Sequence, residues 1–257
     1  MKISTSILNT KDRLDCVRKL NNTRTTYIHV DVMDGKFVQN IELNTKEQIS
    51  SLNYLSNHKL DIHLMVENPI KYIEKLSNMN IEYITFHIEV EKNIKKVISK
   101  IKDLGYKVGL SIKPNTNINK LIPYINDIDL ILVMSVEPGK GGQKFLPNTP
   151  ERIEKIKELI DNNRKDITPI KIEVDGGINN QTIKLLNNVD IAVVGSYITK
   201  SDNYCNQINN LLNSTNNINN NENNSKPNQT NNIIIILLAV CIISIILYLI
   251  STLLLIK

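Results

Sequence analysis

The sequence predicts an α/β protein over residues 1–212, folded as a closed (β/α)8 barrel, or TIM barrel. Short apolar runs alternate with amphipathic segments along this stretch, and there are eight such runs. Alternating strands and helices indicate a parallel sheet. Eight units in about 200 residues fit a closed barrel with short loops better than an open, doubly wound sheet, which is the structural alternative.

The eight predicted strands are short runs rich in isoleucine, leucine and valine. They span residues 3–8, 26–32, 60–66, 83–87, 107–112, 130–136, 170–174 and 191–194. The segments between them carry apolar residues three or four positions apart, opposite a charged side, which is typical of amphipathic helices. Clear examples are Ile94, Val97, Ile98, Ile101 and Leu104, and also Ile153, Ile156, Leu159 and Ile160.

Composition and charge narrow the class of protein. The 257 residues are 41% hydrophobic and 22% charged, which is ordinary for a soluble domain, and the N-terminus lacks the apolar core of a signal peptide. The net charge of +5 is spread over helix faces, so we expect no nucleic-acid partner. Cys16, Cys205 and Cys241 are scattered without a CxxC motif. This pattern fits a reducing compartment and argues against a disulfide framework or a thiolate metal site.

The second predicted strand, YIHVDVMDG, has an unusual polar face. Alternate side chains of a strand point the same way, so His29, Asp31 and Met33 share one face, opposite three aliphatic residues. An imidazole and a carboxylate two residues apart could grip one metal ion. The alternative is that the histidine and the aspartate only satisfy each other.

Residues that could form a site end or follow six of the other seven predicted strands. They are Ser6, His63, His87, Met134 with Ser135, Asp175, and Gly195 with Ser196. Barrel enzymes collect their chemistry at the carboxyl ends of the strands, so we expect these residues to converge on one mouth. The imidazoles of His29 and His63 and the carboxylates of Asp31 and Asp175 form a mixed nitrogen and oxygen set. Such a set suits zinc, iron, manganese or cobalt better than calcium.

Three glycine-containing loops follow the last three strands and indicate a phosphate site. They contain Gly139, Gly141 and Gly142; Gly176 and Gly177; and Gly195 with Ser196. Glycine lets the backbone turn its amide groups toward an anion, and barrels often bind phosphate after strands seven and eight. The alternative is that these glycines only permit tight turns. We interpret Lys140, in the first loop, as a solvated charge.

Six motifs, in this order and spacing, resemble those of ribulose-phosphate 3-epimerases: HVDVMDGKFVQN, DIHLMVENP, ITFH, MSVEPGKGGQKF, IEVDGGIN and VVGS. The resemblance covers residues 2–201, nearly the whole predicted barrel. It implies a metal-dependent isomerase of carbohydrate metabolism. Such an enzyme interconverts D-ribulose 5-phosphate and D-xylulose 5-phosphate in the pentose phosphate pathway, by epimerisation at carbon 3 through an enediolate.

The same resemblance implies a role for each motif residue. The implied ligands of one divalent metal ion are His29, Asp31, His63 and Asp175. Asp31 and Asp175 would also be the two catalytic residues that move the proton. Ser6 and His63 would contact the sugar. The residues implied to line the centre are Met33, Met65 and Met134, and those implied to hold the phosphate are Gly142, Gly176, Gly177, Gly195 and Ser196.

Other functions remain open from the sequence. A sister 3-epimerase acting on a hexulose 6-phosphate, such as allulose 6-phosphate, would share most of this site. A membrane-tethered, non-catalytic adaptor is a second alternative, although all four proposed ligands are present. A barrel decarboxylase or synthase usually has an Asp-x-Lys pair at the third strand, where this chain has Asp61, Ile62 and His63. A homo-oligomer is compatible with the sequence.

The composition changes after residue 212. Residues 213–232 are more than half asparagine, which predicts a disordered, flexible linker. Residues 233–256 are uncharged and largely apolar, and a bilayer core of about 30 Å is crossed by about 20 such residues. We therefore expect a single C-terminal transmembrane helix that anchors the protein in a membrane, with the catalytic barrel facing the cytoplasm.

Overall fold

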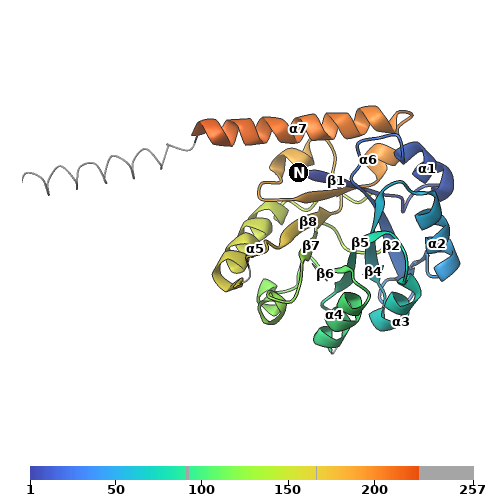
Figure 1. The fold of residues 1–257 in the computed structure, drawn as a ribbon. Helices are drawn as coiled ribbons and strands as arrows, with labels where there is room; N and C mark the ends of the chain where they lie inside the picture. The colour runs from blue at the N-terminus through green and yellow to red at the C-terminus, as the bar shows by residue number, and fades with distance from the viewer. Residues whose placement is uncertain (91–92, 166, 226–257) are drawn as a thin grey trace, which may run out of the picture. The chain divides into compact units, whose positions relative to one another are not determined.

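The computed structural model describes residues 1–90, 93–165 and 167–225, and it contains a barrel of eight parallel strands (Figure 1). The barrel strands are β1 (Lys2–Ser6), β2 (Tyr27–Asp34), β4 (Lys59–Met65), β5 (Ile81–His87), β6 (Lys107–Ile112), β7 (Leu130–Met134), β8 (Lys171–Asp175) and β9 (Ile191–Val194). Each lies within two residues of its predicted position at either end. Met1–Thr215 form one compact unit.

The sheet closes on itself through its first strand. β1 pairs in parallel with β9 on one side and with β2 on the other, so the chain of paired strands forms a ring. This closure confirms the predicted (β/α)8 barrel and excludes the doubly wound alternative. One strand was not predicted: β3 (Ile41–Glu42) pairs antiparallel with the end of β2. Two residues are too few to show a periodic pattern.

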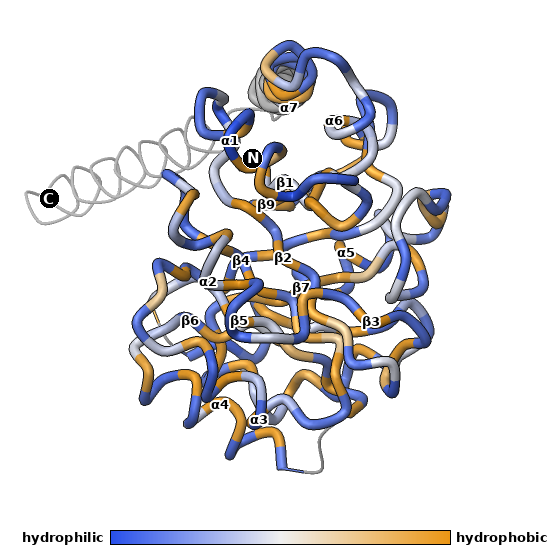
Figure 2. Tube along the Cα trace, turned by 90° about the vertical axis from the view of Figure 1, so that its right-hand side faces the viewer, coloured by the Kyte–Doolittle hydropathy of each residue, from blue (hydrophilic) through white to orange (hydrophobic). Residues whose placement is uncertain are grey.

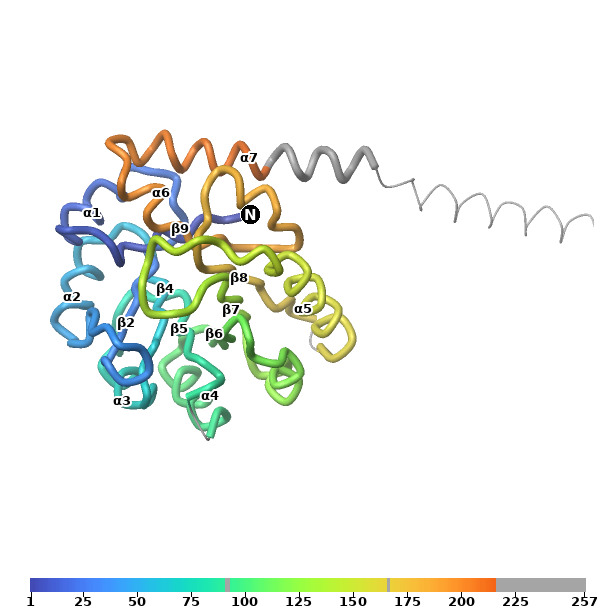
Figure 3. The backbone as a smooth tube through the Cα atoms, turned by 180° about the vertical axis from the view of Figure 1, so that it is seen from behind, coloured from blue at the N-terminus to red at the C-terminus, as the bar shows by residue number. Residues whose placement is uncertain are grey.

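Helices surround the strands as an outer ring (Figure 3). The α-helices are α1 (Arg13–Leu20), α2 (Lys46–Leu55), α3 (Pro69–Ile73), α4 (Ile94–Asp103), α5 (Thr149–Asn163), α6 (Ser196–Thr199) and α7 (Tyr204–Ser225). Local sequence explains where they begin. Thr45 and Gln48 form a capping box at the start of α2, and Asp12 caps α1.

Two of the strand connections contain 3-10 helices where the alternation predicts α-helices. These are η2 (Ile118–Tyr124) and η3 (Thr182–Leu185), and a further 3-10 turn, η1 (Glu74–Leu76), continues α3. Pro123 lies inside η2, where its missing backbone N–H prevents a regular α-helix. The barrel strands pair around the ring on both sides of these short connections.

The strands separate two hydrophobic cores. The outward side chains of β2, which are Ile28, Val30 and Val32, are fully buried in the larger core between strands and helices. A smaller core fills the inside of the barrel, and its members are Tyr27, Tyr83, Leu130, Leu132, Met134, Val136 and Ile191. The helices accordingly alternate hydrophobic and hydrophilic stretches along their length (Figure 2). With both faces of β2 buried, its polar face must lie inside the barrel.

The helix α7 continues past the predicted domain boundary at Leu212. Ile208, Leu211 and Thr215 are buried about one turn apart, which explains why the helix does not stop there. Residues 213–225, the first part of the segment predicted to be a flexible linker, belong to this helix. The rest of that segment and the transmembrane helix predicted at 233–256 lie outside the described residues. Within the described part of the chain, no helix has the length and apolarity needed to span a bilayer.

Candidate active site

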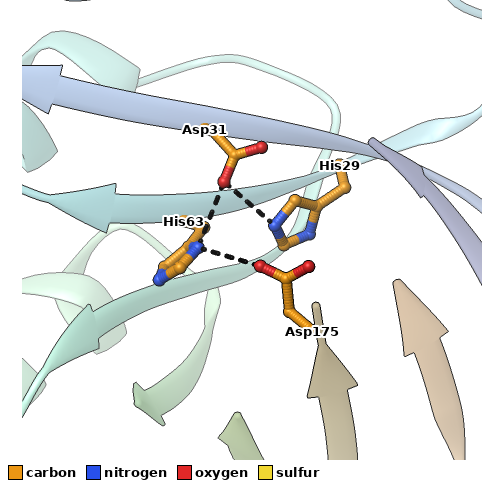
Figure 4. A group of neighbouring side chains, drawn as sticks. All are labelled: His29, Asp31, His63 and Asp175. Carbon is orange, nitrogen blue, oxygen red and sulfur yellow. Dashed lines mark hydrogen bonds and ion pairs between the residues drawn. The ribbon is translucent and has the colours of Figure 1, made fainter. Parts of the chain in front are cut away.

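Four side chains from three strands meet inside the barrel mouth (Figure 4). His29 and Asp31 come from β2, His63 comes from β4, and Asp175 ends β8. Asp31 lies directly opposite His63 in the parallel pairing of β2 with β4, so these two must be neighbours. Closure of the barrel brings β8 close enough for Asp175 to complete the group.

The four residues form one compact cluster of ligand atoms. One nitrogen or oxygen from each residue lies within 4.8 Å of the corresponding atoms of the others. Oδ1 of Asp31 is 3.2 Å from Nδ1 of His63 and 3.5 Å from Nε2 of His29. Oδ2 of Asp175 is 3.9 Å from the same His63 nitrogen. The sequence-predicted set of His29, Asp31, His63 and Asp175 is therefore brought together in space.

Hydrogen bonds on the side of the ring that faces away from the cluster orient His29. Its Nδ1 lies 2.8 Å from Oδ2 of Asp61, which also accepts a 2.8 Å hydrogen bond from the Ser4 hydroxyl. A carboxylate only accepts, so Nδ1 of His29 carries the proton and Nε2 is directed at the cluster. Ser6 donates a 3.0 Å hydrogen bond to Oδ2 of Asp31 and so leaves Oδ1 directed at the cluster.

The two cluster carboxylates differ in their pKa. Burial acts to raise the pKa of Asp31, but His29 and His63 outweigh it and hold that pKa well below its usual range. Burial, reinforced by the charge of Asp31, raises the pKa of Asp175 to about 6, although His29 lowers it in part. Burial would lower the pKa of His29, but Asp61 and Asp31 raise it well above its usual value. Near neutral pH, Asp31 is the firmly ionised carboxylate of the two.

The cluster could hold a metal ion. Nε2 of His29 is buried and has no hydrogen-bond partner among the described residues, as expected for a ligand nitrogen. Two imidazole nitrogens and two carboxylate oxygens suit a divalent transition metal. A cation would also offset the negative charge that Asp31 and Asp175 place close together. The residues present therefore fit the metal that the sequence predicts.

A second group of potential ligands shares His29 with this cluster and lies deeper in the barrel. It consists of His29, Asp61 and Glu173, all fully buried. Burial, followed by repulsion from Asp61, raises the pKa of Glu173 well above its usual range, which disfavours its ionised form. The ionised form is the one that binds a metal, so the first cluster is the better site.

A cavity of about 350 Å³ opens beside the cluster. The predicted site residues that line it are Ser6, Asp31, Met65, Met134, Gly139, Gly141, Gly142, Asp175, Gly176, Gly177, Gly195 and Ser196. His29, His63 and Met33 are fully buried and are not part of this lining. The cavity thus joins the two cluster carboxylates to all three predicted phosphate loops.

Gly177 shows why the loop after β8 needs glycine. Its φ is +64°, a left-handed conformation, and a Cβ atom there would lie 2.3 Å from the backbone nitrogen of Phe145. Phe145 belongs to the loop after β7, so the two loops touch backbone to backbone. This close approach fixes the wall of the cavity that carries Gly176 and Gly177.

Sequence reasoning missed several residues at the site. Asn9, Gln143, Asn179 and Lys200 line the cavity, and so does Lys140, which the sequence suggested was only a solvated loop charge. The sequence signal that could have found them is their position, because each follows the carboxyl end of a strand. His87 was noted as a strand end without a role, and its Nε2 lies 2.9 Å from Nε2 of His63. Burial lowers the pKa of His87 to about 4, so its imidazole is neutral near pH 7.

The ribulose-phosphate 3-epimerase family model matches residues 2–199, which is nearly the whole barrel. Similar proteins include a ribulose-phosphate 3-epimerase of Buchnera aphidicola, 39% identical over 69% of this chain and 78% of that protein. Another, from Helicobacter pylori, is 35% identical over 78% of this chain and 92% of that protein. A third, from Aquifex aeolicus, is 39% identical over 66% of this chain and 76% of that protein.

More distant solved structures share the fold. KGPDC from Streptococcus mutans has a TM-score of 0.63 at 12% identity, covering 84% of this chain and 98% of its own. Mycobacterium tuberculosis tryptophan synthase has a TM-score of 0.60 at 10% identity, covering 83% and 91%. These likenesses concern the barrel alone. The family match, the close relatives and the His/Asp cluster together show that this chain belongs to the ribulose-phosphate 3-epimerase family.

Proposed function

We propose that this protein interconverts D-ribulose 5-phosphate and D-xylulose 5-phosphate by moving the proton at carbon 3. The observation that carries the proposal is the placement of Asp31 and Asp175, two carboxylates from different strands, on one cavity beside two histidines. Membership of the family supports the same reaction. No feature of the cavity favours a hexulose phosphate over the pentulose phosphate.

Epimerisation requires two acid/base groups, because the proton must leave one face of the carbon and return on the other. Asp31 and Asp175 come from different strands and both border the cavity, so one can accept the proton while the other returns one. The Ser6 hydroxyl holds Asp31 in place during the transfer. The two carboxyl groups thus provide one base and one acid.

Removing the proton leaves negative charge on the enediolate, and the protein must stabilise it. His29, Asp31, His63 and Asp175 would hold one divalent ion of zinc, iron, manganese or cobalt, which when bound supplies a Lewis acid next to that charge. Met65 and Met134 line the same cavity with thioethers that exclude water and exchange no protons. The glycines after β7, β8 and β9 offer backbone amides to the phosphate.

We also propose that residues 233–256 anchor the protein in a membrane, with the barrel in the cytoplasm. The support is the uncharged, apolar character of this segment in the sequence. Scattered cysteines and a phosphorylated substrate are consistent with a cytoplasmic barrel.

The test of function is an epimerase assay on D-ribulose 5-phosphate with the metal exchanged. Chelation should abolish turnover, and zinc, iron, manganese or cobalt should restore it. Allulose 6-phosphate, assayed in parallel, should be turned over more slowly. Full activity of the metal-free protein would disprove the ligand set, and no activity with any metal would disprove the reaction.

A further inference from the structure

His63 is supported differently from His29. Nδ1 of His29, the ring nitrogen that is turned away from the cluster, faces the carboxylate of Asp61 directly. The corresponding nitrogen of His63, Nε2, instead faces Nε2 of His87 at 2.9 Å. The two rings are stacked, with centroids 5.0 Å apart. On its other side, Nδ1 of His87 lies 3.2 Å from Oε2 of Glu89. Glu89, His87 and His63 therefore form a line of hydrogen-bonding groups that ends at the cluster.

Two facing imidazole nitrogens can bond only if one carries the proton and the other does not. In the first arrangement, His63 donates from Nε2, and its Nδ1 is left bare and directed at Asp31. His87 then carries its proton on Nδ1 and donates it to Glu89. In the second arrangement each ring carries its proton on the other nitrogen, so Nδ1 of His63 is protonated and cannot bind a metal.

Glu89 favours the first arrangement because a carboxylate can only accept. Its Oε1 is already engaged by the Lys113 backbone N–H at 2.8 Å and by the Thr116 hydroxyl, which leaves Oε2 for His87. At the other end of the line, Asp31 could accept a proton from Nδ1 of His63, which would favour the second arrangement. A cation bound by Asp31 and Asp175 would occupy Asp31 and so remove this competing acceptor.

We propose that Glu89, acting through His87, keeps Nδ1 of His63 unprotonated and so available to the divalent ion. The proposal rests on the proposed function only in placing the metal at the cluster. Phe37 packs on His87, with ring centroids 4.7 Å apart, and seals this pair from one side. Glu89 and His87 are thus positioning residues, each outside the lining of the cavity.

The variant Glu89→Gln tests the proposal with little change in shape. The Lys113 N–H requires an acceptor, so the glutamine oxygen takes the place of Oε1 and its NH2 group faces Nδ1 of His87. The line of hydrogen bonds then reverses and puts a proton on Nδ1 of His63. Titration of the metal-free, full-length variant with Co²⁺ should show affinity about 10- to 100-fold weaker than that of the natural protein.

Thr116→Val is the matched control. It removes one hydrogen bond to Glu89 but keeps the carboxylate, so its Co²⁺ affinity should stay within about two-fold of the natural value, a change of about 0.4 kcal/mol or less. Unchanged Co²⁺ affinity in Glu89→Gln would overturn the proposal. The proposal would also be overturned if Glu89→Gln and Thr116→Val weakened Co²⁺ binding equally.

A second measurement needs no variant. The chain has four histidines, so the imidazole nitrogens of the zinc-loaded, full-length protein can be assigned by ¹⁵N NMR. His87 should carry its proton on Nδ1, and a proton on Nε2 would overturn the proposal even if Glu89→Gln failed to fold. Neither measurement uses a substrate. A lack of epimerase activity in the natural protein would therefore count against the proposed reaction and leave this test unaffected.

Discussion

At the scale of single residues, the environment gives chemically identical carboxyl groups different tasks. Asp31 is surrounded by imidazoles and stays ionised, whereas Asp175 lies beside Asp31 and has a raised pKa of about 6. Asp61 orients a histidine, and the pKa of Glu173 is raised well above its usual range by burial and by Asp61. Their sequence neighbours do not reveal these differences. The contacts made after the barrel closes produce them.

Replacing Asp175 by asparagine should stop proton transfer without unfolding the barrel. The amide keeps the shape of the side chain, of which 20% is exposed, but cannot accept the carbon 3 proton. Exchange of that proton with solvent deuterium, followed by NMR, should slow by about 10²- to 10⁴-fold. The exposed Asp103→Asn is the control and should exchange normally. Near-normal exchange in Asp175→Asn would show that another group moves the proton.

Asp34 should make stability depend on pH. Its carboxylate accepts backbone hydrogen bonds from Lys36, Phe37 and Glu67, at 2.9, 3.1 and 2.8 Å. Burial acts to raise its pKa, but these three bonds outweigh burial and lower it. Asparagine cannot accept with both of its terminal atoms, so Asp34→Asn should lower the free energy of unfolding by about 1–3 kcal/mol at neutral pH.

The pH dependence follows from the direction of that shift. A depressed pKa in the folded state contributes stability above the unfolded value of about 3.9, and this contribution is lost as the pH falls through the folded pKa. Urea unfolding should therefore show a gap between the natural protein and Asp34→Asn that is full at pH above about 5 and narrows below about 3.9. A gap that stays constant over this range would exclude the carboxylate charge as its cause.

At the scale of elements, the loop after β8 is held by contact rather than by conformation alone. Gly177 and Gly105 both have left-handed backbones, with φ of +64° and +79°. A Cβ atom at Gly105 would meet nothing within 4 Å, whereas one at Gly177 would collide with Phe145. Comparing alanine at the two positions therefore separates the cost of conformation from the cost of collision.

Gly105→Ala should lose about 1 kcal/mol of unfolding free energy from backbone conformation. Gly177→Ala should lose more, and it should also weaken the binding of inorganic phosphate because the loop must move away from Phe145. Phosphate titration and thermal unfolding of both variants measure the two effects. If Gly177→Ala bound phosphate as tightly as Gly105→Ala, the loop would not form the phosphate site.

The elements also show how far the sequence could predict the site. The alternation in YIHVDVMDG places His29 and Asp31 on one face, and closure of the barrel puts that face inside, as predicted. The support of His63 by His87 and Glu89 could not be read in this way. It depends on which ring nitrogens face each other, and spacing along a strand does not determine that. Pro123, which lies inside η2, likewise disfavours an α-helix there without specifying the 3-10 turn.

At the scale of the whole molecule, the barrel contains all the described parts of the site. The cluster, the cavity and the line of hydrogen-bonding groups through His87 are built from β1 to β9 and their loops, within Met1–Thr215. Among the described residues, none after Thr215 lines the cavity or belongs to the cluster. This separation gives the predicted membrane anchor a direct test, in which location and turnover are measured independently.

Truncation should be made after Ser225, because this keeps every turn of α7 and its buried Thr215, which a cut at Leu212 would remove. The full-length protein should sediment with membranes, and the truncated protein should stay in the supernatant with an unchanged turnover number. A cut after Leu212 is the matched comparison and should lower the melting temperature, because it removes the buried Thr215. A full-length protein that stays in the supernatant would refute the anchor, and a large fall in turnover after truncation at Ser225 would show that the tail acts on the active site.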